Sequence, residues 1–152
     1  MSNAFSSMRR AYRVEGSSAV PQIHSGILAT GSYLPKEEVS NDEIALRIGT
    51  TSEWIERKTQ IRTRRYAAPD EATSDLAAKA AMEALERAGI DPEQLDYLLV
   101  STSTGDFPQP PTSTLVQELI GATNAACLDL NAVCSGFVFA LEMARGAHCT
   151  QS

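Results

Sequence analysis

The sequence has few cysteines and histidines and no long apolar run. Its three cysteines are Cys127, Cys134 and Cys149, and they form neither a Cys-x-x-Cys pair nor a cluster with histidine. An odd cysteine count argues against a disulfide framework, so we expect a reducing, cytoplasmic location. Because there is no Cys-x-x-Cys pair and no histidine cluster, we expect no metal site. Because no apolar stretch approaches the roughly 20 residues that span a bilayer, we also expect no membrane contact.

Positive charge is scarce as well. There are 13 Lys and Arg residues against 19 Asp and Glu residues, which gives a formal net charge of −6 and argues against a nucleic acid partner. One basic cluster opposes this average and consists of Arg57, Lys58, Arg62, Arg64 and Arg65. Such a cluster suits a phosphate-bearing ligand, and the nearby Trp54 can stack on a base. A solvated basic face with Trp54 as a core anchor is an equally good interpretation.

The length of the chain, 152 residues, suits one domain with a core and is too short for two. Residues 1–22 are rich in Ser and Ala and have no sustained periodicity, so we predict an N-terminal extension followed by a domain over residues 23–152. The first four residues, Met1 to Ala4, are typical of a remnant of recombinant expression. We exclude them from the fold prediction.

Apolar spacing predicts helices that alternate with strands. The clearest helix runs from Ser74 to Ala88, capped by Thr73 or Ser74. The other expected helices are 41–48 with Asn41 as N-cap, a short helix capped by Ser52, 112–120 and 137–144, and the expected strands are 23–30, 97–100 and 125–130. Segment 137–144 is apolar on all sides, which predicts a helix enclosed by protein. The alternation favours an α/β fold with a mostly parallel sheet, and α+β is the alternative.

Cys134 stands where a predicted strand ends and a predicted helix begins. A helix N-terminus presents free N–H groups and a partial positive charge, which favour the nucleophilic thiolate. Gly136 leaves room for a close approach of a substrate or of a neighbouring helix. The alternative is that Cys134 is a small core residue, which is the usual fate of a free cysteine. Cys127 lies inside a strand pattern and is predicted to be core, and Cys149 has no motif around it.

A polar loop, Thr102 to Thr112, follows one predicted strand and precedes a helix. It therefore lies at the carboxyl end of that strand, where ligand sites of open α/β sheets form. A plain connecting loop is the alternative interpretation.

Taken together, these stretches resemble the 3-oxoacyl-(acyl-carrier-protein) synthase III family of the thiolase superfamily, also called beta-ketoacyl synthase III. The resemblance runs from about Ser25 to Gly146. It rests on the order and spacing of Gly31–Pro35, Glu53–Ile55, Thr59–Arg65, Ala67–Glu71 and Asn131–Phe137. It implies the N-terminal half of a thiolase-like fold, which is layered α-β-α-β-α in the complete enzyme, and a homodimer.

The resemblance also implies a reaction. An acyl group from acyl-coenzyme A moves to Cys134 and then condenses with malonyl-acyl carrier protein to give a 3-oxoacyl product, as in the initiation of fatty acid biosynthesis. Acyl-coenzyme A is a substrate, and no cofactor is implied. Its site would include Trp54 against the adenine, with Thr50, Lys58 and Thr59 nearby. Lys58 stands where the family usually has Arg, and it lacks the planar guanidinium that stacks.

Two departures from the family leave alternatives open. Gln60 replaces a usual glycine, and the family His and Asn that assist decarboxylation belong to a half that this sequence does not contain. We therefore expect a fragment that is inactive in condensation on its own. A quinolone- or polyketide-type condensing enzyme, or a non-catalytic fragment that binds acyl-coenzyme A or mediates dimerisation, are the alternative functions.

Overall fold

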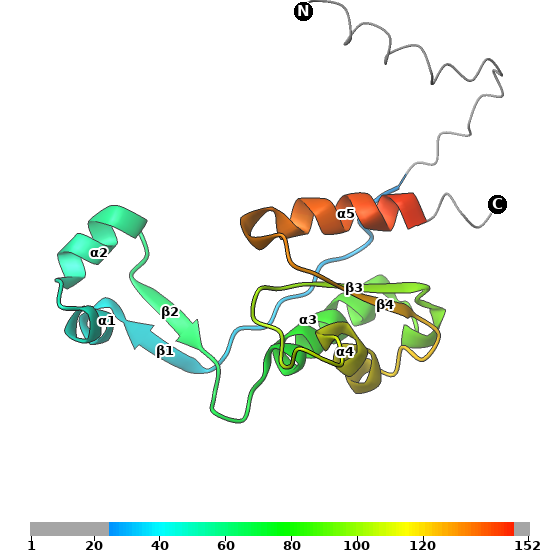
Figure 1. Cartoon of the computed structure of the whole chain (residues 1–152), viewed down its shortest axis with the longest axis horizontal. Coiled ribbons are helices and arrows are strands. Elements are labelled where there is room, and N and C mark those ends of the chain that lie inside the picture. The colour runs from blue at the N-terminus through cyan, green and yellow to red at the C-terminus, as the bar shows by residue number, and fades with distance from the viewer. Residues whose placement is uncertain (1–24, 148–152) are drawn as a thin grey trace, which may run out of the picture.

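The computed structural model describes residues 25–147, which form two groups of elements joined by extended chain (Figure 1). The predicted extension 1–22, the first two residues of the predicted strand 23–30 and Cys149 lie outside the described residues. One group comprises β1 (Glu37–Ser40), α1 (Asn41–Ile48), α2 (Ser52–Thr59) and β2 (Thr63–Tyr66). The other comprises α3 (Thr73–Ala88), η2 (Pro92–Gln94), β3 (Tyr97–Ser101), α4 (Thr112–Ile120), β4 (Ala126–Leu130), η3 (Val133–Ser135) and α5 (Gly136–Ala147).

The second group is built on a parallel pair of strands, β3 and β4. Tyr97 pairs with Ala126 at one end and Ser101 with Leu130 at the other. Helices α3 and α4 cover one face of the pair and α5 lies on the other face (Figure 1). The buried core between the sheet and helices α3 and α4 consists of Ala78, Val100, Val116, Ile120, Ala122 and Ala125. This arrangement confirms the predicted parallel strands and α/β class.

The predicted strand 23–30 is wrong over its described part. Residues 25–35 belong to no strand, and residues 30–33 instead contact α3. A side chain on Gly31 would place its Cβ only 2.1 Å from the backbone oxygen of Ala80, so glycine is needed for this close approach. Glu83 and Arg87 of α3 then bond the segment: Ser32 N donates to Glu83 Oε2 at 2.6 Å, and Arg87 donates to the Thr30 carbonyl at 3.0 Å. Helix side chains thus replace the partner strand that the prediction assumed.

The predicted helix caps lie one or two residues away from the observed ones. Ser40 caps α1 and forms a capping box with Glu43, because its hydroxyl accepts the Glu43 N–H. Asn41 is instead buried, with its amide donating to the Ile61 carbonyl at 2.8 Å and accepting from Arg64 at 2.8 Å. Its position inside the first turn lets it tie α1 to the start of β2.

The caps of the next two helices also differ from the prediction. Thr51, not Ser52, caps α2 by accepting the Trp54 N–H at 3.2 Å. The N-cap of α3 is Ala72, whose side chain cannot cap, and Ser74 is buried against Asp106 from a distant loop. A side chain far along the chain therefore caps α3, which local spacing could not reveal.

Strands β1 and β2 form an antiparallel pair that the sequence analysis missed. Glu37 pairs with Tyr66 and Ser40 with Thr63. Each strand has only four residues, mostly polar, and only Val39 of β1 is a buried apolar residue, with 1% of its surface exposed. The usual period-two alternation of apolar residues was therefore absent from both segments.

Helix α5 forms where it was expected, but it is not enclosed by the described residues. Phe137, Val138 and Phe139 are 70%, 67% and 56% exposed, and Gly136 is its only buried residue. One face of α5 contacts β3, and the remaining apolar side chains lie open. None of the helices in residues 25–147 is long and apolar enough to cross a membrane.

Glu71 anchors the extended segment to α3. Its carboxylate accepts from Lys79 at 2.6 Å and from the Tyr33 hydroxyl at 2.5 Å, and its other oxygen accepts the Ala68 N–H at 3.1 Å. The Lys79 hydrogen bond, followed by that of Tyr33, lowers the pKa of Glu71 to about 2. A carboxyl whose pKa is depressed on folding stabilises the fold above its unfolded pKa and loses this effect as pH falls through the folded pKa.

We therefore predict that Glu71→Gln flattens the pH dependence of stability between the unfolded pKa of 4.5 and about 2. Urea unfolding midpoints over this pH range, followed by circular dichroism, measure the effect. Glu86→Gln is the control, because Glu86 is an exposed carboxylate on α3 with no ion pair among the described residues. Equal pH profiles for Glu71→Gln and the unsubstituted chain would show that the network does not stabilise the fold.

Candidate functional site

Cys134 lies in the short turn that joins β4 to α5. Strand β4 ends at Leu130, the turn includes the 3-10 helix Val133–Ser135, and α5 begins at Gly136. Cys134 is exposed to solvent and makes no disulfide. The structure therefore places the thiol at the predicted junction of strand and helix, and the core alternative for Cys134 does not hold within residues 25–147.

The residue before the thiol has a strained backbone. Val133 has φ of +46°, in the left-handed region, and its side chain is 75% exposed. A β-branched residue rarely adopts this conformation, because Cβ is crowded by the neighbouring carbonyl. Such strain persists only where the surroundings hold it, and it gathers at functional sites. The backbone strain at Val133, next to Cys134, is therefore an independent indication that this turn has a functional role.

Gly136 brings α5 against the end of β3. A Cβ at this position would lie 1.9 Å from Ser101 Oγ and 3.3 Å from Ser101 Cβ, so any side chain here would require Ser101 to move. The close approach is thus made to a strand residue, whereas the sequence predicted a substrate or a neighbouring helix. Because Gly136 is the first residue of α5, this contact fixes the start of the helix directly after Cys134.

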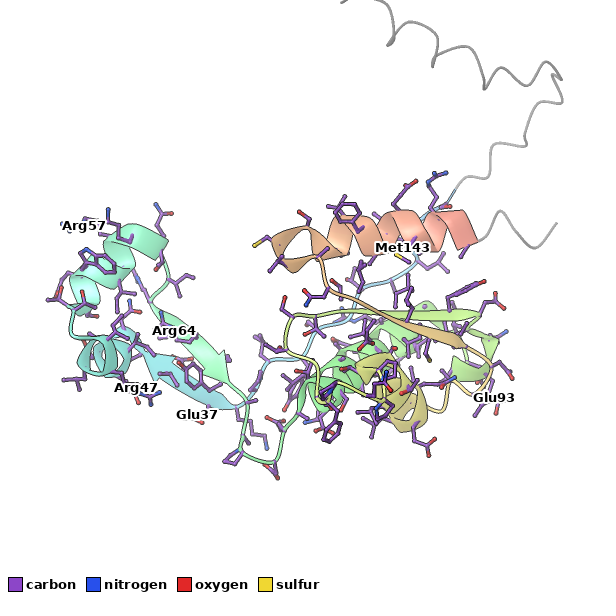
Figure 2. All side chains as sticks on the ribbon, in the orientation of Figure 1. Glu37, Arg47, Arg57, Arg64, Glu93 and Met143 are labelled. Atoms are coloured by element: carbon purple, nitrogen blue, oxygen red, sulfur yellow. The ribbon has the colours of Figure 1, made fainter. Side chains whose placement is uncertain are left out.

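Cys127 differs from Cys134 in its position in the fold and in its exposure to solvent. It lies within β4, is half-buried, and lines a small cavity of about 130 Å³ with Met143 of α5, which points toward the sheet (Figure 2). Burial, and then the charge of Asp129, raise the pKa of the Cys127 thiol. A raised pKa leaves less of the thiol as thiolate, so the Cys127 thiol is a weak nucleophile. Its position in the strand agrees with the predicted structural role.

Asp129 fastens β4 to the N-terminus of α4. Its two carboxylate oxygens accept the backbone N–H groups of Thr112 and Ser113, each at 2.7 Å. Burial raises the pKa of this carboxyl, but hydrogen bonds with Ser113 and Thr112 together outweigh burial and keep the pKa below its usual value. The carboxylate thus takes the place of an N-cap, since Pro111 in that position has no side-chain hydrogen bond.

The polar loop after β3 lies at the same edge of the sheet as the turn of residues 131–135 that carries Cys134, here called the cysteine turn. Its Asp106 accepts from Ser74, as described above, and Thr73 donates to the Thr104 carbonyl at 2.5 Å. Ser103 donates to Asn131 Oδ1 at 3.1 Å. The loop is therefore attached both to α3 and to the segment that carries Cys134, as expected for the carboxyl edge of a parallel sheet.

The four residues predicted to bind coenzyme A lie in the other group of elements, on and beside α2. Trp54 is 44% exposed, which does not support the core-anchor interpretation. Lys58 is exposed in the last turn of α2, and Thr50 is half-buried just before the helix. Thr59 has a local role, because its hydroxyl donates to the Ile55 carbonyl at 2.8 Å and accepts the Ile61 N–H at 3.1 Å.

The structure divides the basic cluster into paired and unpaired members. Arg62 pairs with Glu56 at 2.9 Å, Arg65 pairs with Glu38 at 2.7 Å, and Arg64 donates to Asn41. Among the described residues, Arg57 and Lys58 have no such partner. Figure 2 shows Arg57 at the end of the group that is remote from β3 and β4. A phosphate-bearing ligand would therefore meet Arg57 and Lys58 beside Trp54.

The end of α2 explains one departure from the resembled family. Gln60 is the C-cap of α2 and has φ of +57°, in the left-handed region. Glycine reaches this conformation without steric cost, which accounts for the glycine usual at this position. Within residues 25–147 there is no group of three or more side chains that could hold a metal ion.

Comparisons with curated proteins find close relatives that are much longer. The chain is 56% identical over 120 residues to the acetoacetyl CoA synthase of Streptomyces sp. strain CL190, covering 79% of this chain and 36% of the relative. It is 49% identical over 118 residues to the beta-ketoacyl-(acyl-carrier-protein) synthase III of Ehrlichia canis, covering 78% of this chain and 37% of the relative. The chain thus spans little more than a third of these relatives. No family model matches it.

Solved structures agree with these relatives. The priming beta-ketosynthase of the R1128 polyketide pathway superimposes with a TM-score of 0.74 at 42% identity, covering 84% of this chain and 40% of that one. The 3-oxoacyl-(acyl-carrier-protein) synthase III of Aquifex aeolicus superimposes with a TM-score of 0.77 at 37% identity, covering 81% and 40%. Both similarities extend across the two groups of elements described above.

The strain at Val133 leads to a prediction about stability. Val133→Gly should raise the free energy of unfolding by about 0.5–1 kcal/mol, because relief of a left-handed backbone exceeds the entropy cost of glycine. Val138→Gly is the matched control, since Val138 is similarly exposed but lies within α5, and there glycine should lower stability by a few tenths of a kcal/mol. Denaturant titration measures both changes. A loss of stability in Val133→Gly would contradict the strain.

Proposed function

This chain is homologous to the N-terminal portion of the 3-oxoacyl-(acyl-carrier-protein) synthase III enzymes, and from that premise we propose that it carries the acyl-accepting half of a condensing enzyme. Its α/β fold is the N-terminal half of the thiolase-like fold. In this proposal Cys134 is the residue that is acylated. The strained, exposed turn at the carboxyl edge of β4 is the observation that carries it.

The proposed acyl transfer needs a nucleophile and a leaving group. The Cys134 thiolate attacks the thioester carbon of acyl-coenzyme A, a new carbon–sulfur bond forms, and the bond to the coenzyme A sulfur breaks. The coenzyme A thiolate leaves and takes up a proton from water. The free N–H groups at the start of α5 lie directly after Cys134, where a helix dipole stabilises negative charge. The half-buried Cys127 with its raised pKa is a much weaker candidate.

Condensation is the second step of the proposed activity. Malonyl-acyl carrier protein loses carbon dioxide, and the carbanion attacks the acyl group on Cys134 to release a 3-oxoacyl product. This step needs donors that stabilise the developing negative charge. In the resembled family a His and an Asn provide them, and residues 25–147 contain no histidine. We therefore propose that this polypeptide accepts the acyl group and requires further residues to condense it.

Trp54, Arg57 and Lys58 form the proposed coenzyme A contact. A half-exposed indole offers a face to the adenine, and unpaired cations beside it suit the phosphates. Thr50 lies next to α2 and completes this surface. Thr59 is retained in the proposed set through its backbone position at the end of α2, because its hydroxyl is already engaged.

A second candidate function follows from the name of one relative. The 56% identical protein is an acetoacetyl CoA synthase, whereas the 49% identical protein is a synthase acting with acyl carrier protein, as its name states. Both readings share acyl transfer to Cys134 and differ in what carries the condensing group. Supplying the polypeptide together with the remaining portion of the Streptomyces relative, and offering malonyl-coenzyme A or malonyl-acyl carrier protein, distinguishes the two.

The finer features of the family are part of the same proposal. We place residues 23–152 in one N-terminal thiolase-like domain, with residues 1–22 as an extension outside the described residues. We propose a cytoplasmic homodimer that acts in fatty acid biosynthesis or a related pathway. Size-exclusion chromatography with light scattering tests the dimer.

We predict that incubation with acetyl-coenzyme A adds an acetyl group to the peptide containing Cys134. Trypsin digestion and mass spectrometry locate the adduct, because Cys127 and Cys134 are distinguished by fragmentation. Cys134→Ala should abolish the adduct and Cys127→Ala should leave it. Addition of malonyl-acyl carrier protein should yield no 3-oxoacyl product. An adduct on Cys127 with Cys134 unmodified would overturn the assignment.

We predict that Trp54→Ala raises the acetyl-coenzyme A concentration that half-saturates Cys134 acylation by about tenfold, with the maximal rate changed less. Stacking of one base on an aromatic ring contributes about 1–3 kcal/mol, and it stabilises the ground and transition states alike. Tyr97→Ala is the control, because Tyr97 is also half-exposed, at 43%, but lies on β3. An unchanged half-saturating concentration in folded Trp54→Ala would assign Trp54 a structural role.

A further inference from the structure

The turn that carries Cys134 is attached to the neighbouring strand segment by one side-chain hydrogen bond. Ser103 Oγ donates to Asn131 Oδ1 at 3.1 Å. Just before it, Thr102 N donates to the Leu130 carbonyl at 3.1 Å, which is the last backbone bond between the two segments. Among the described residues, no other side-chain hydrogen bond joins residues 131–135 to the rest of the fold. Asn131 is therefore the first residue after β4 that has no backbone hydrogen bond to the segment following β3.

The backbone beyond Asn131 is the strained part of the turn. Val133 is held at a positive φ, and the bond from Ser135 N to the Ala132 carbonyl at 3.0 Å lies within the turn itself. A strained conformation persists only where surrounding contacts over-determine it. The contact of Gly136 with Ser101 holds the far end of the turn, and the Ser103 bond to Asn131 holds the near end. Cys134 lies between these two attachments.

Ser103 is itself held in place by the loop that follows β3. Thr104 N donates to Thr102 Oγ1 at 3.0 Å, and the Thr104 carbonyl accepts from Thr73 of α3 at 2.5 Å. Asp106, a few residues on, accepts from Ser74 at the start of α3. Ser103 thus belongs to a segment that is hydrogen-bonded to α3. Because this segment is fixed, the Ser103 hydroxyl can restrict the position of Asn131.

We propose that Ser103 and Asn131 are positioning residues for acylation of Cys134. Their hydrogen bond fixes the near end of the strained turn, so that the Cys134 sulfur is presented to the thioester in one orientation. Neither residue touches the reacting atoms. The inference rests on the proposed function of Cys134 as acyl acceptor, and it adds two residues from different segments to that site.

The test measures the acylation rate of Cys134 in the full 152-residue chain with acetyl-coenzyme A. Asn131→Ala and Ser103→Ala should each lower the maximal rate about fivefold, equal to about 1 kcal/mol, the usual net effect of one hydrogen bond. The half-saturating acetyl-coenzyme A concentration should not change. The double variant should be no slower than either single one, because both remove the same bond. Ser103→Thr retains the hydroxyl and should retain most of the rate.

Asn124→Ala is the matched control. Asn124 precedes β4 as Asn131 follows it, and its amide donates to the Glu93 carbonyl at 2.8 Å. This variant also loses one asparagine hydrogen bond at an end of β4, but at the end remote from Cys134. We expect similar unfolding midpoints for Asn124→Ala and Asn131→Ala, with the acylation rate lowered only in Asn131→Ala. Alkylation of Cys127 by iodoacetamide in each variant provides an internal reference and should be unchanged.

The outcomes separate the two proposals. An unsubstituted chain that is not acylated on Cys134 contradicts the proposed function, and the variants are then compared by iodoacetamide alkylation of Cys134, which still reports how the turn presents the sulfur. Normal rates in Asn131→Ala and Ser103→Ala overturn the positioning role. Equal slowing in Asn124→Ala, or additive slowing in the double variant, overturns it too. If circular dichroism shows that Asn131→Ala does not fold, the comparison of Ser103→Ala with Ser103→Thr decides between the outcomes, because Ser103 is exposed.

Discussion

The pairing of the Asp129 carboxylate with the N-terminus of α4 determines where the rest of the site lies. Two backbone N–H groups of α4 donate to this side chain of β4, so the strand and the helix hold each other in register. The start of α4 in turn ends the polar loop after β3. Because the hydrogen bonds depress the pKa of Asp129, this link is strong above the unfolded pKa and weakens as pH falls through the folded one. The cysteine turn begins two residues later.

The two parts of the proposed site belong to different groups of elements. The proposed acyl-accepting turn follows β4, whereas the proposed coenzyme A contact lies on α2, beside the antiparallel pair β1 and β2 (Figure 1). Extended chain and the contacts of Glu71 connect the groups. A long ligand can therefore be held at one end by the nucleotide and at the other by the thioester. Small changes at the connection would alter the distance between these ends.

Sequence reasoning succeeded where local pattern decides the structure and failed where distant contacts decide it. The helices, the parallel strands and the junction at Cys134 follow from local sequence patterns, and α1, α3 and α4 end at glycines. The prediction of a strand at 23–30 is wrong over residues 25–30 because the chain there pairs with no strand, and Thr30 is bonded by helix α3 instead. Local spacing did not reveal the α3 cap from Asp106, the ion pairs that divide the basic cluster or the strain at Val133, since each depends on the folded backbone.

The open apolar face of α5 has a colloidal consequence. Phe137, Val138 and Phe139 are each more than half exposed to water within the described part of the chain. Exposed patches of this kind promote self-association at micromolar concentrations and recruit chaperones and hydrophobic dyes. The net charge of −6 opposes such association at low ionic strength and is screened as salt is added. Salt and protein concentration therefore govern how the isolated polypeptide behaves in solution, through the same helix that begins just after the turn carrying Cys134.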